Sequence, residues 1–173
     1  MPTSAADFGT ILRVLAGHGA LYAVVGGVAA VLQGVSVTTF DLDVVHSRSP
    51  ENLDRLLAAL EQLDAYYREQ QQRRIRPDRS LLASSGHQLL MTSSGPLDLL
   101  GTIVGGRGYE DLLPHTVELD LGDGVRVRVV ELATLVQLKQ ELGRAKDLAS
   151  LPILRRTLEE RERGQGGPIP RPG

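Results

Sequence analysis

Apolar residues recur along the chain in two spacings, one typical of helices and one typical of strands. Residues 5–18 place apolar side chains at helical spacing, and so do the residues that follow Ser49-Pro50-Glu51. That triplet is typical of a helix start, because the hydroxyl caps free amides and proline fits the first turn. Shorter apolar runs of strand length lie at residues 21–25, 42–45, 88–92 and 97–103.

The second half of the chain continues this alternation. Residues 116–121 and 125–130 flank Gly122-Asp123-Gly124, a strong hairpin signal. Residues 131–142 and 146–162 predict two helices separated at Gly143. The remaining expectations are a short helix at 28–33, an arginine-rich loop or frayed helix at 66–80, and a helical turn at 109–113.

This order of elements predicts an α/β (α+β) fold, with a central mixed β-sheet flanked by helices. We expect one domain over residues 1–163, with a helical C-terminal part at 131–163. The glycine- and proline-rich residues 164–173 predict a disordered tail.

Composition narrows the class of protein. A chain of 173 residues without cysteine has no disulfide framework and no thiolate metal site. No segment has the length and apolarity of a membrane span, and the first ten residues lack the features of a signal peptide, so we expect a cytoplasmic protein without a membrane partner. A net charge of −2 and 3% aromatic residues argue against a general nucleic-acid surface or a base-stacking platform.

Two glycines close the first apolar strand. Gly26-Gly27 would let backbone amides approach a ligand, and the helix that follows would present free N–H groups to phosphate. Alone, such a pair is more often only a turn. The spacing does not match the dinucleotide-binding G-x-G-x-x-G pattern.

Asp41 and Asp43 lie two residues apart in an extended segment, so their side chains point to the same face. Two like charges about 5 Å apart repel by roughly 3 kcal/mol at an effective dielectric constant of 20. A cation between them relieves this repulsion, and carboxylate oxygens suit Mg²⁺. A lone Asp-x-Asp is nevertheless more often a solvated strand end. The dehalogenase-type nucleophile motif is disfavoured, because here the apolar run follows the aspartates instead of preceding them.

Asp98 interrupts a run that otherwise predicts a buried strand, where acids are rare without a partner. The alternative is an acid that faces water from an edge strand. If the Asp98 strand neighbours the Asp41 strand, three carboxylates converge and can hold two metal ions for a phosphoryl displacement.

Together, Gly26-Gly27, Asp41-Leu42-Asp43 and Leu97-Asp98-Leu99 resemble the signature of the DNA polymerase β-type nucleotidyltransferase superfamily. Gly34 and the C-terminal residues Lys139 and Arg144 to Asp147 resemble its small bacterial branch, related to abortive-infection and toxin–antitoxin nucleotidyltransferases. The resemblance covers roughly residues 20 to 160.

The resemblance implies a polymerase β-like fold and a two-metal enzyme that transfers NMP from an NTP, such as ATP, to an acceptor hydroxyl and releases pyrophosphate. The implied cofactor is Mg²⁺ or Mn²⁺, and the acceptor is RNA, a protein or a small molecule. A toxin role, with a cognate antitoxin as partner, rests on analogy alone. The implied catalytic residues and metal ligands are Asp41, Asp43 and Asp98, and the implied nucleotide-binding residues are Gly26, Gly27, Thr39, Lys139, Arg144 and Lys146.

One position departs from the family pattern. Members often carry an arginine four residues before the first aspartate, where this chain has Val37, although Thr39 remains. The loss of this guanidinium motivates an alternative from another class, a catalytically silent module of the same fold that binds a nucleotide or a partner.

Several basic residues carry two interpretations. Lys139 lies beside the apolar stripe of its predicted helix, so it either reaches a triphosphate or snorkels at the core edge. Arg144 and Lys146 begin a helix, where they either bind the nucleotide or are solvated. The arginines at positions 68–79 either dock an RNA acceptor or form a solvated loop balanced by Glu69 and Asp78. The four histidines show no metal-ligand spacing; His46 follows the Asp43 strand and could approach the site.

Overall fold

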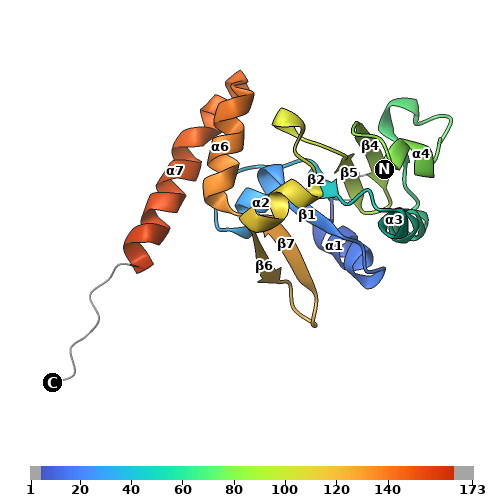
Figure 1. Cartoon of the computed structure of the whole chain (residues 1–173), viewed down its shortest axis with the longest axis horizontal. Coiled ribbons are helices and arrows are strands. Elements are labelled where there is room, and N and C mark those ends of the chain that lie inside the picture. The colour runs from blue at the N-terminus through green and yellow to red at the C-terminus, as the bar shows by residue number, and fades with distance from the viewer. Residues whose placement is uncertain (1–4, 166–173) are drawn as a thin grey trace.

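A computed structural model describes residues 5–165 of the chain. A seven-stranded mixed sheet in the order β3-β4-β5-β2-β1-β7-β6 forms its centre, with helices packed around it (Figure 1). This confirms the predicted α/β architecture. The strands are β1 (Tyr22–Val25), β2 (Leu42–His46), β3 (Tyr66–Tyr67), β4 (His87–Thr92), β5 (Gly95–Leu100), β6 (Thr116–Asp120) and β7 (Arg126–Val130).

The sheet is mixed because its centre contains both kinds of pairing. β2 runs parallel to β5 and antiparallel to β1, while β1 runs parallel to β7. The hairpins β4–β5 and β6–β7 add antiparallel pairs on the two sides. β1 and most of β2 are buried, as expected for central strands that carry continuous apolar runs.

The helices begin and end largely where capping residues place them. Asp7 caps α1 by accepting a hydrogen bond from Thr10 N, and Ser49 caps α3 by accepting one from Asn52 N. Gly143 ends α6 in the left-handed conformation that glycine adopts without strain. The helices are α1 (Phe8–Gly17), α2 (Gly26–Leu32), α3 (Pro50–Gln62), α4 (Arg79–Leu82), α5 (Tyr109–Leu112), α6 (Leu132–Leu142) and α7 (Ala145–Gln165), with short 3₁₀ turns η1 (Arg68–Gln70), η2 (Val104–Gly106) and η3 (Leu113–His115).

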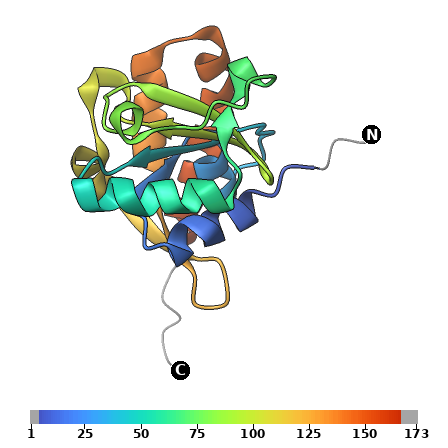
Figure 2. The same cartoon turned by 90° about the vertical axis from the view of Figure 1, so that its right-hand side faces the viewer.

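α1 and α3 bury the apolar stripes that the sequence predicted. Ile11, Leu12 and Leu15 of α1 are buried, as are Leu53, Leu56 and Leu60 of α3. α1 contacts α3, whereas α2 contacts β1, β2 and α6. α6 and α7 lie side by side at one end of the sheet, and α3 and α4 lie toward the other end (Figures 1 and 2).

Several boundaries differ from the sequence-based expectations, and three of these differences matter most. The short helix predicted at 28–33 begins earlier, because both glycines belong to its first turn. The segment predicted as a loop or frayed helix at 66–80 instead contains β3, η1 and α4, since Tyr66 and Tyr67 pair with Met91 and Leu90. The last helix extends to Gln165, so the tail predicted at 164–173 does not begin at 164; positions 166–173 lie outside the described residues.

Candidate active site

Two of the three predicted acids are direct neighbours across the sheet. In the parallel pairing of β2 with β5, Asp43 lies opposite Asp98. Neighbouring strands lie about 4.8 Å apart and residues in register point to the same face, so the two carboxyl groups share one side of the sheet. Asp98 therefore belongs to a central strand rather than to an edge facing water.

The proximity of these acids changes their titration. Burial, followed by the charge of Asp98 and a hydrogen bond shared with it, raises the pKa of Asp43 from 3.8 to about 7. Burial also raises the pKa of Asp98, although the nearby Arg68 guanidinium opposes the rise. A carboxyl pair of this kind is stabilised either by a retained proton or by a cation.

Arg68, at the start of η1, reaches this pair from outside the predicted site. Its Nη2 lies 2.7 Å from Asp98 Oδ1, and its Nη1 donates a hydrogen bond of 3.0 Å to the carbonyl oxygen of Leu90 on β4. The approach to Oδ1 is too oblique for a hydrogen bond, so within residues 5–165 that buried oxygen has an ion-pair partner but no donor aligned with it. Sequence reasoning grouped Arg68 with a surface loop and missed this contact.

Asp41 precedes β2, where the chain enters the sheet. Thr39 Oγ1 donates a hydrogen bond of 3.0 Å to the carbonyl oxygen of Asp41 and so fixes this entry. The Asp41 charge contributes to the raised pKa of Asp43. Thr39 thus lies at the site, and its observed contact is with the backbone that presents Asp41.

The glycine pair is required by close approach to these same residues. A Cβ atom on Gly26 would lie 2.5 Å from Asp43 Oδ2, and Gly26 adopts a φ of +66°. A Cβ atom on Gly27 would lie 2.9 Å from Thr39 Oγ1. No side chain caps the first turn of α2. The glycines therefore allow the first turn of α2 to lie directly against the aspartate strand.

A cleft of about 480 Å³ opens over this arrangement. The glycine turn, the entry to β2 and Asp43 form one side, and α6 with the start of α7 forms the other. Asp98 is only 8% exposed and does not line the cleft; it lies beside Asp43 in the sheet. Nearly all predicted site residues meet at this cleft: Gly26, Gly27, Thr39, Asp41, Asp43, Lys139, Arg144 and Lys146.

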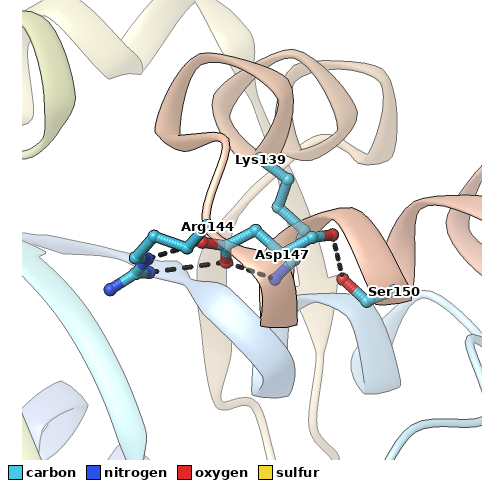
Figure 3. Close-up of polar contacts among 4 residues, drawn as sticks. All are labelled: Lys139, Arg144, Asp147 and Ser150. Atoms are coloured by element: carbon cyan, nitrogen blue, oxygen red, sulfur yellow. Dashed lines mark hydrogen bonds and ion pairs between the residues drawn. The ribbon is translucent and has the colours of Figure 1, made fainter.

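The basic wall of the cleft is organised around a buried carboxylate, Asp147 (Figure 3). Lys139 Nζ lies 3.3 Å from Asp147 Oδ1, and Arg144 Nε donates a hydrogen bond of 2.6 Å to Oδ2. Burial acts to raise the pKa of Asp147, but the contacts with Arg144 and Lys139 outweigh it and lower the pKa below its usual value. Asp147 therefore holds the Lys139 and Arg144 side chains at the cleft, whereas Lys146 lines the cleft as an exposed residue.

Apolar side chains form the remaining part of the cleft. Val37, at the position where the resembled family often carries arginine, lines it and packs against the core. Phe40 also lines it and remains 78% exposed. Sequence reasoning did not identify Phe40, and the signal that could have done so was an aromatic residue directly before the Asp41-Leu42-Asp43 motif.

The donor set fits a divalent cation in part. Asp43 and Asp98 supply two adjacent carboxylates, and hard oxygen ligands suit Mg²⁺ and Mn²⁺. Over residues 5–165, however, no three His, Cys, Asp or Glu side chains lie close enough together to hold a metal ion. Asp43 and Asp98 thus meet as predicted, and the three-carboxylate metal site remains a prediction.

Two of the histidines hydrogen-bond backbone carbonyl oxygens, one away from the cleft and one at it. His46 is buried, and its Nε2 hydrogen-bonds the Leu82 carbonyl oxygen. Of the remaining histidines only His87 lines the cleft, where its Nε2 lies 3.0 Å from the Thr102 carbonyl oxygen.

The arginine-rich segment is largely neutralised by acids other than those expected. Arg74 and Arg76 pair with Asp64, and Arg79 pairs with Asp54. Asp78 instead caps α4 by accepting a hydrogen bond from Leu81 N.

No helix within residues 5–165 is both long enough and apolar enough to cross a membrane.

Comparison with known proteins supports the fold. No family model and no curated protein matches the sequence. Among solved structures, the chain is similar to a Thermotoga maritima protein named "a putative nucleotidyltransferase", with a TM-score of 0.54 and 18% identity over 88% of this chain and 91% of that one. At this level of identity the likeness is one of fold alone, and in this chain that fold is a central mixed sheet flanked by helices.

Proposed function

We propose that this protein is a metal-dependent nucleotidyltransferase that transfers a nucleoside monophosphate from an NTP to an acceptor hydroxyl. One observation carries the proposal: Asp43 lies in register with Asp98 beneath a cleft whose opposite wall carries Lys139, Arg144 and Lys146. Acidic side chains on one side of the cleft can hold a cation, and basic side chains on the other can pair with phosphates, so the cleft suits a cation-bound triphosphate. The fold neighbour's name agrees with this activity.

Each group in the cleft has a task in this reaction. Asp41 and Asp43 hold Mg²⁺ or Mn²⁺, which neutralises charge on the triphosphate. Backbone amides at Gly26 and Gly27 bind phosphate oxygens, since no side chain caps that turn. Lys139 and Arg144, held by Asp147, pair with the phosphate charge that grows as pyrophosphate leaves.

The transfer step makes one bond and breaks one bond. The acceptor oxygen attacks the α-phosphorus, and the bond from that phosphorus to the bridging oxygen of the β-phosphate breaks. The proton of the acceptor hydroxyl goes to the Asp43–Asp98 pair, of which Asp43 lines the cleft, and burial raises the pKa of both acids. The products are an NMP-modified acceptor and pyrophosphate.

The experiment uses each of the four α-³²P-labelled NTPs with Mg²⁺ or Mn²⁺. Total RNA and a protein lysate serve as acceptors, separately, and the labelled product identifies the acceptor class. We expect labelling by the wild type, its loss in Asp43→Ala, and its retention in Asp123→Ala, which makes the same change in the exposed β6–β7 loop. Full activity of Asp43→Ala would refute the site assignment.

The second candidate is a catalytically silent binding module, and Val37 in the cleft wall favours it. Such a module would bind an NTP but label no acceptor. Fluorescent NTP analogues measure this binding independently of transfer. Binding that is lost in Lys139→Met, without product from any acceptor, would support the module over the enzyme. A toxin role with an antitoxin partner is a further proposal, for which an inhibitory protein bound at the cleft is the expected sign.

A further inference from the structure

Arg68 differs from the other arginines of its segment in what it contacts. Arg74, Arg76 and Arg79 pair with exposed acids. Arg68 instead turns toward the sheet and meets Asp98, with side-chain exposures of 20% and 11% for the two partners. Within residues 5–165, Arg68 is thus the one arginine of this segment that contacts the Asp43–Asp98 pair.

The sheet fixes the position of this guanidinium. Arg68 follows β3 directly, β3 pairs with β4, and the Arg68 side chain donates to the Leu90 carbonyl oxygen on β4. Leu90 is itself opposite Leu97, the residue before Asp98. The backbone pairing of β3 with β4 and the hydrogen bond to Leu90 therefore hold one positive charge next to Asp98 Oδ1.

In the two-metal arrangement that the family resemblance implies, Asp98 is a metal ligand, so a second divalent cation would have to approach its carboxyl oxygens. Asp98 Oδ1 is buried and already has the Arg68 charge 2.7 Å away. Asp98 also lies directly opposite Asp43 in the pairing of β5 with β2. A guanidinium stays protonated at any pH at which proteins fold, so its charge always opposes the approach of a cation to Oδ1.

We propose that Arg68 takes the place of the second divalent cation, so that the site binds one divalent cation at Asp41 and Asp43 and uses the Arg68 guanidinium as the second positive charge beside Asp98. This inference rests on the proposed function and replaces the two-metal enzyme that the family resemblance implies with one cation and one arginine. It assigns Arg68 as a positioning residue, since it acts through Asp98.

The test counts Mn²⁺ bound to the full chain, by electron paramagnetic resonance of the free ion during a titration without nucleotide. The variants are Arg68→Ala and the matched control Arg73→Ala, which removes the same charge from an exposed position of the same segment. Arg68→Lys keeps the charge and serves as the conservative variant. Circular dichroism checks that each variant is folded.

We expect one Mn²⁺ per chain in the wild type, in Arg73→Ala and in Arg68→Lys. Arg68→Ala should bind a second Mn²⁺ with an affinity at least about tenfold higher than any second binding in the wild type, because the charge opposing it is gone. Magnetic coupling between two bound ions would give the second site its own spectroscopic signature.

Two Mn²⁺ per wild-type chain, or no gain in Arg68→Ala over Arg73→Ala, would overturn the inference and leave the proposed function standing. No Mn²⁺ bound to the wild type would also overturn the inference, whereas the proposed function is decided by the labelling assay, in which the cation can arrive with the nucleotide. If Arg68→Ala does not fold, the counts for the wild type and Arg68→Lys decide between one cation and two.

Discussion

The Asp43–Asp98 pair predicts an unusual dependence of stability on pH. The pKa of Asp43 lies at about 7 in the folded protein against 3.8 as the ordinary value. The folded state therefore binds the proton more tightly than the unfolded state. The contribution of this bound proton to the free energy of unfolding is fully present below about pH 4, and it is lost as the pH rises through about 7.

The size of the effect follows from the shift. A rise of about three pKa units corresponds to about 4 kcal/mol as an upper bound. Asp43 is partly exposed and shares its proton with Asp98, so we expect about 2 kcal/mol. Asp43→Asn removes the titration while keeping the shape, and it should be more stable than the wild type by this amount near pH 8 but not near pH 4.

Urea unfolding followed by circular dichroism in EDTA measures the difference at several pH values. Other acids also titrate, but they do so in both proteins, and the difference between wild type and variant isolates Asp43. Asp123→Asn, the same change in an exposed loop, should leave the profile unchanged. Parallel pH profiles for the wild type and Asp43→Asn would refute the raised pKa of Asp43.

Three further changes test other parts of the cleft. Asp147→Asn should lower the free energy of unfolding by about 1–3 kcal/mol, because Lys139 and Arg144 lose their buried charged partner. The same variant should raise KM for the nucleotide if these two side chains bind phosphate. Gly26→Ala should destabilise the protein more than Gly124→Ala, because both glycines have a positive φ but only a Cβ atom at position 26 would crowd a carboxylate. Equal losses of unfolding free energy in urea would contradict this crowding. Phe40→Ala should raise KM for the NTP up to about tenfold with kcat retained if the exposed ring stacks on the base, whereas Ile75→Ala should change neither.

The sequence was sufficient where local pattern and burial coincide. An acid inside the apolar run around Asp98 indicated a site, whereas the shared face that a period of two predicts for Asp41 and Asp43 stays a prediction, because Asp41 precedes β2. The pairing of β2 with β5 then brought Asp43 and Asp98 together, as the three-aspartate pattern required.

Contacts between distant segments could not be read in this way. Arg68 belongs to a polar stretch with no periodicity, and only the pairing of the two-residue β3 with β4 turns it toward Asp98. Asp147 had the pattern of a residue that complements a helix dipole, but the packing of α6 on α7 buries it between two bases. Both depend on tertiary register, which no local signal specifies.

The distribution of charge favours one order of binding. The acids Asp41, Asp43 and Asp98 lie on the floor of the cleft or beneath it, and much of the charge on the opposite wall is already balanced by Asp147. A free triphosphate would meet repulsion from the floor and only partial attraction from the wall. When the triphosphate arrives with its cation, the cation offsets the repulsion from the acids on the floor. The phosphates can then compete with Asp147 for the basic side chains. The cleft is therefore suited to the cation–nucleotide complex rather than to the nucleotide alone, and chelation should weaken nucleotide binding as strongly as it weakens transfer.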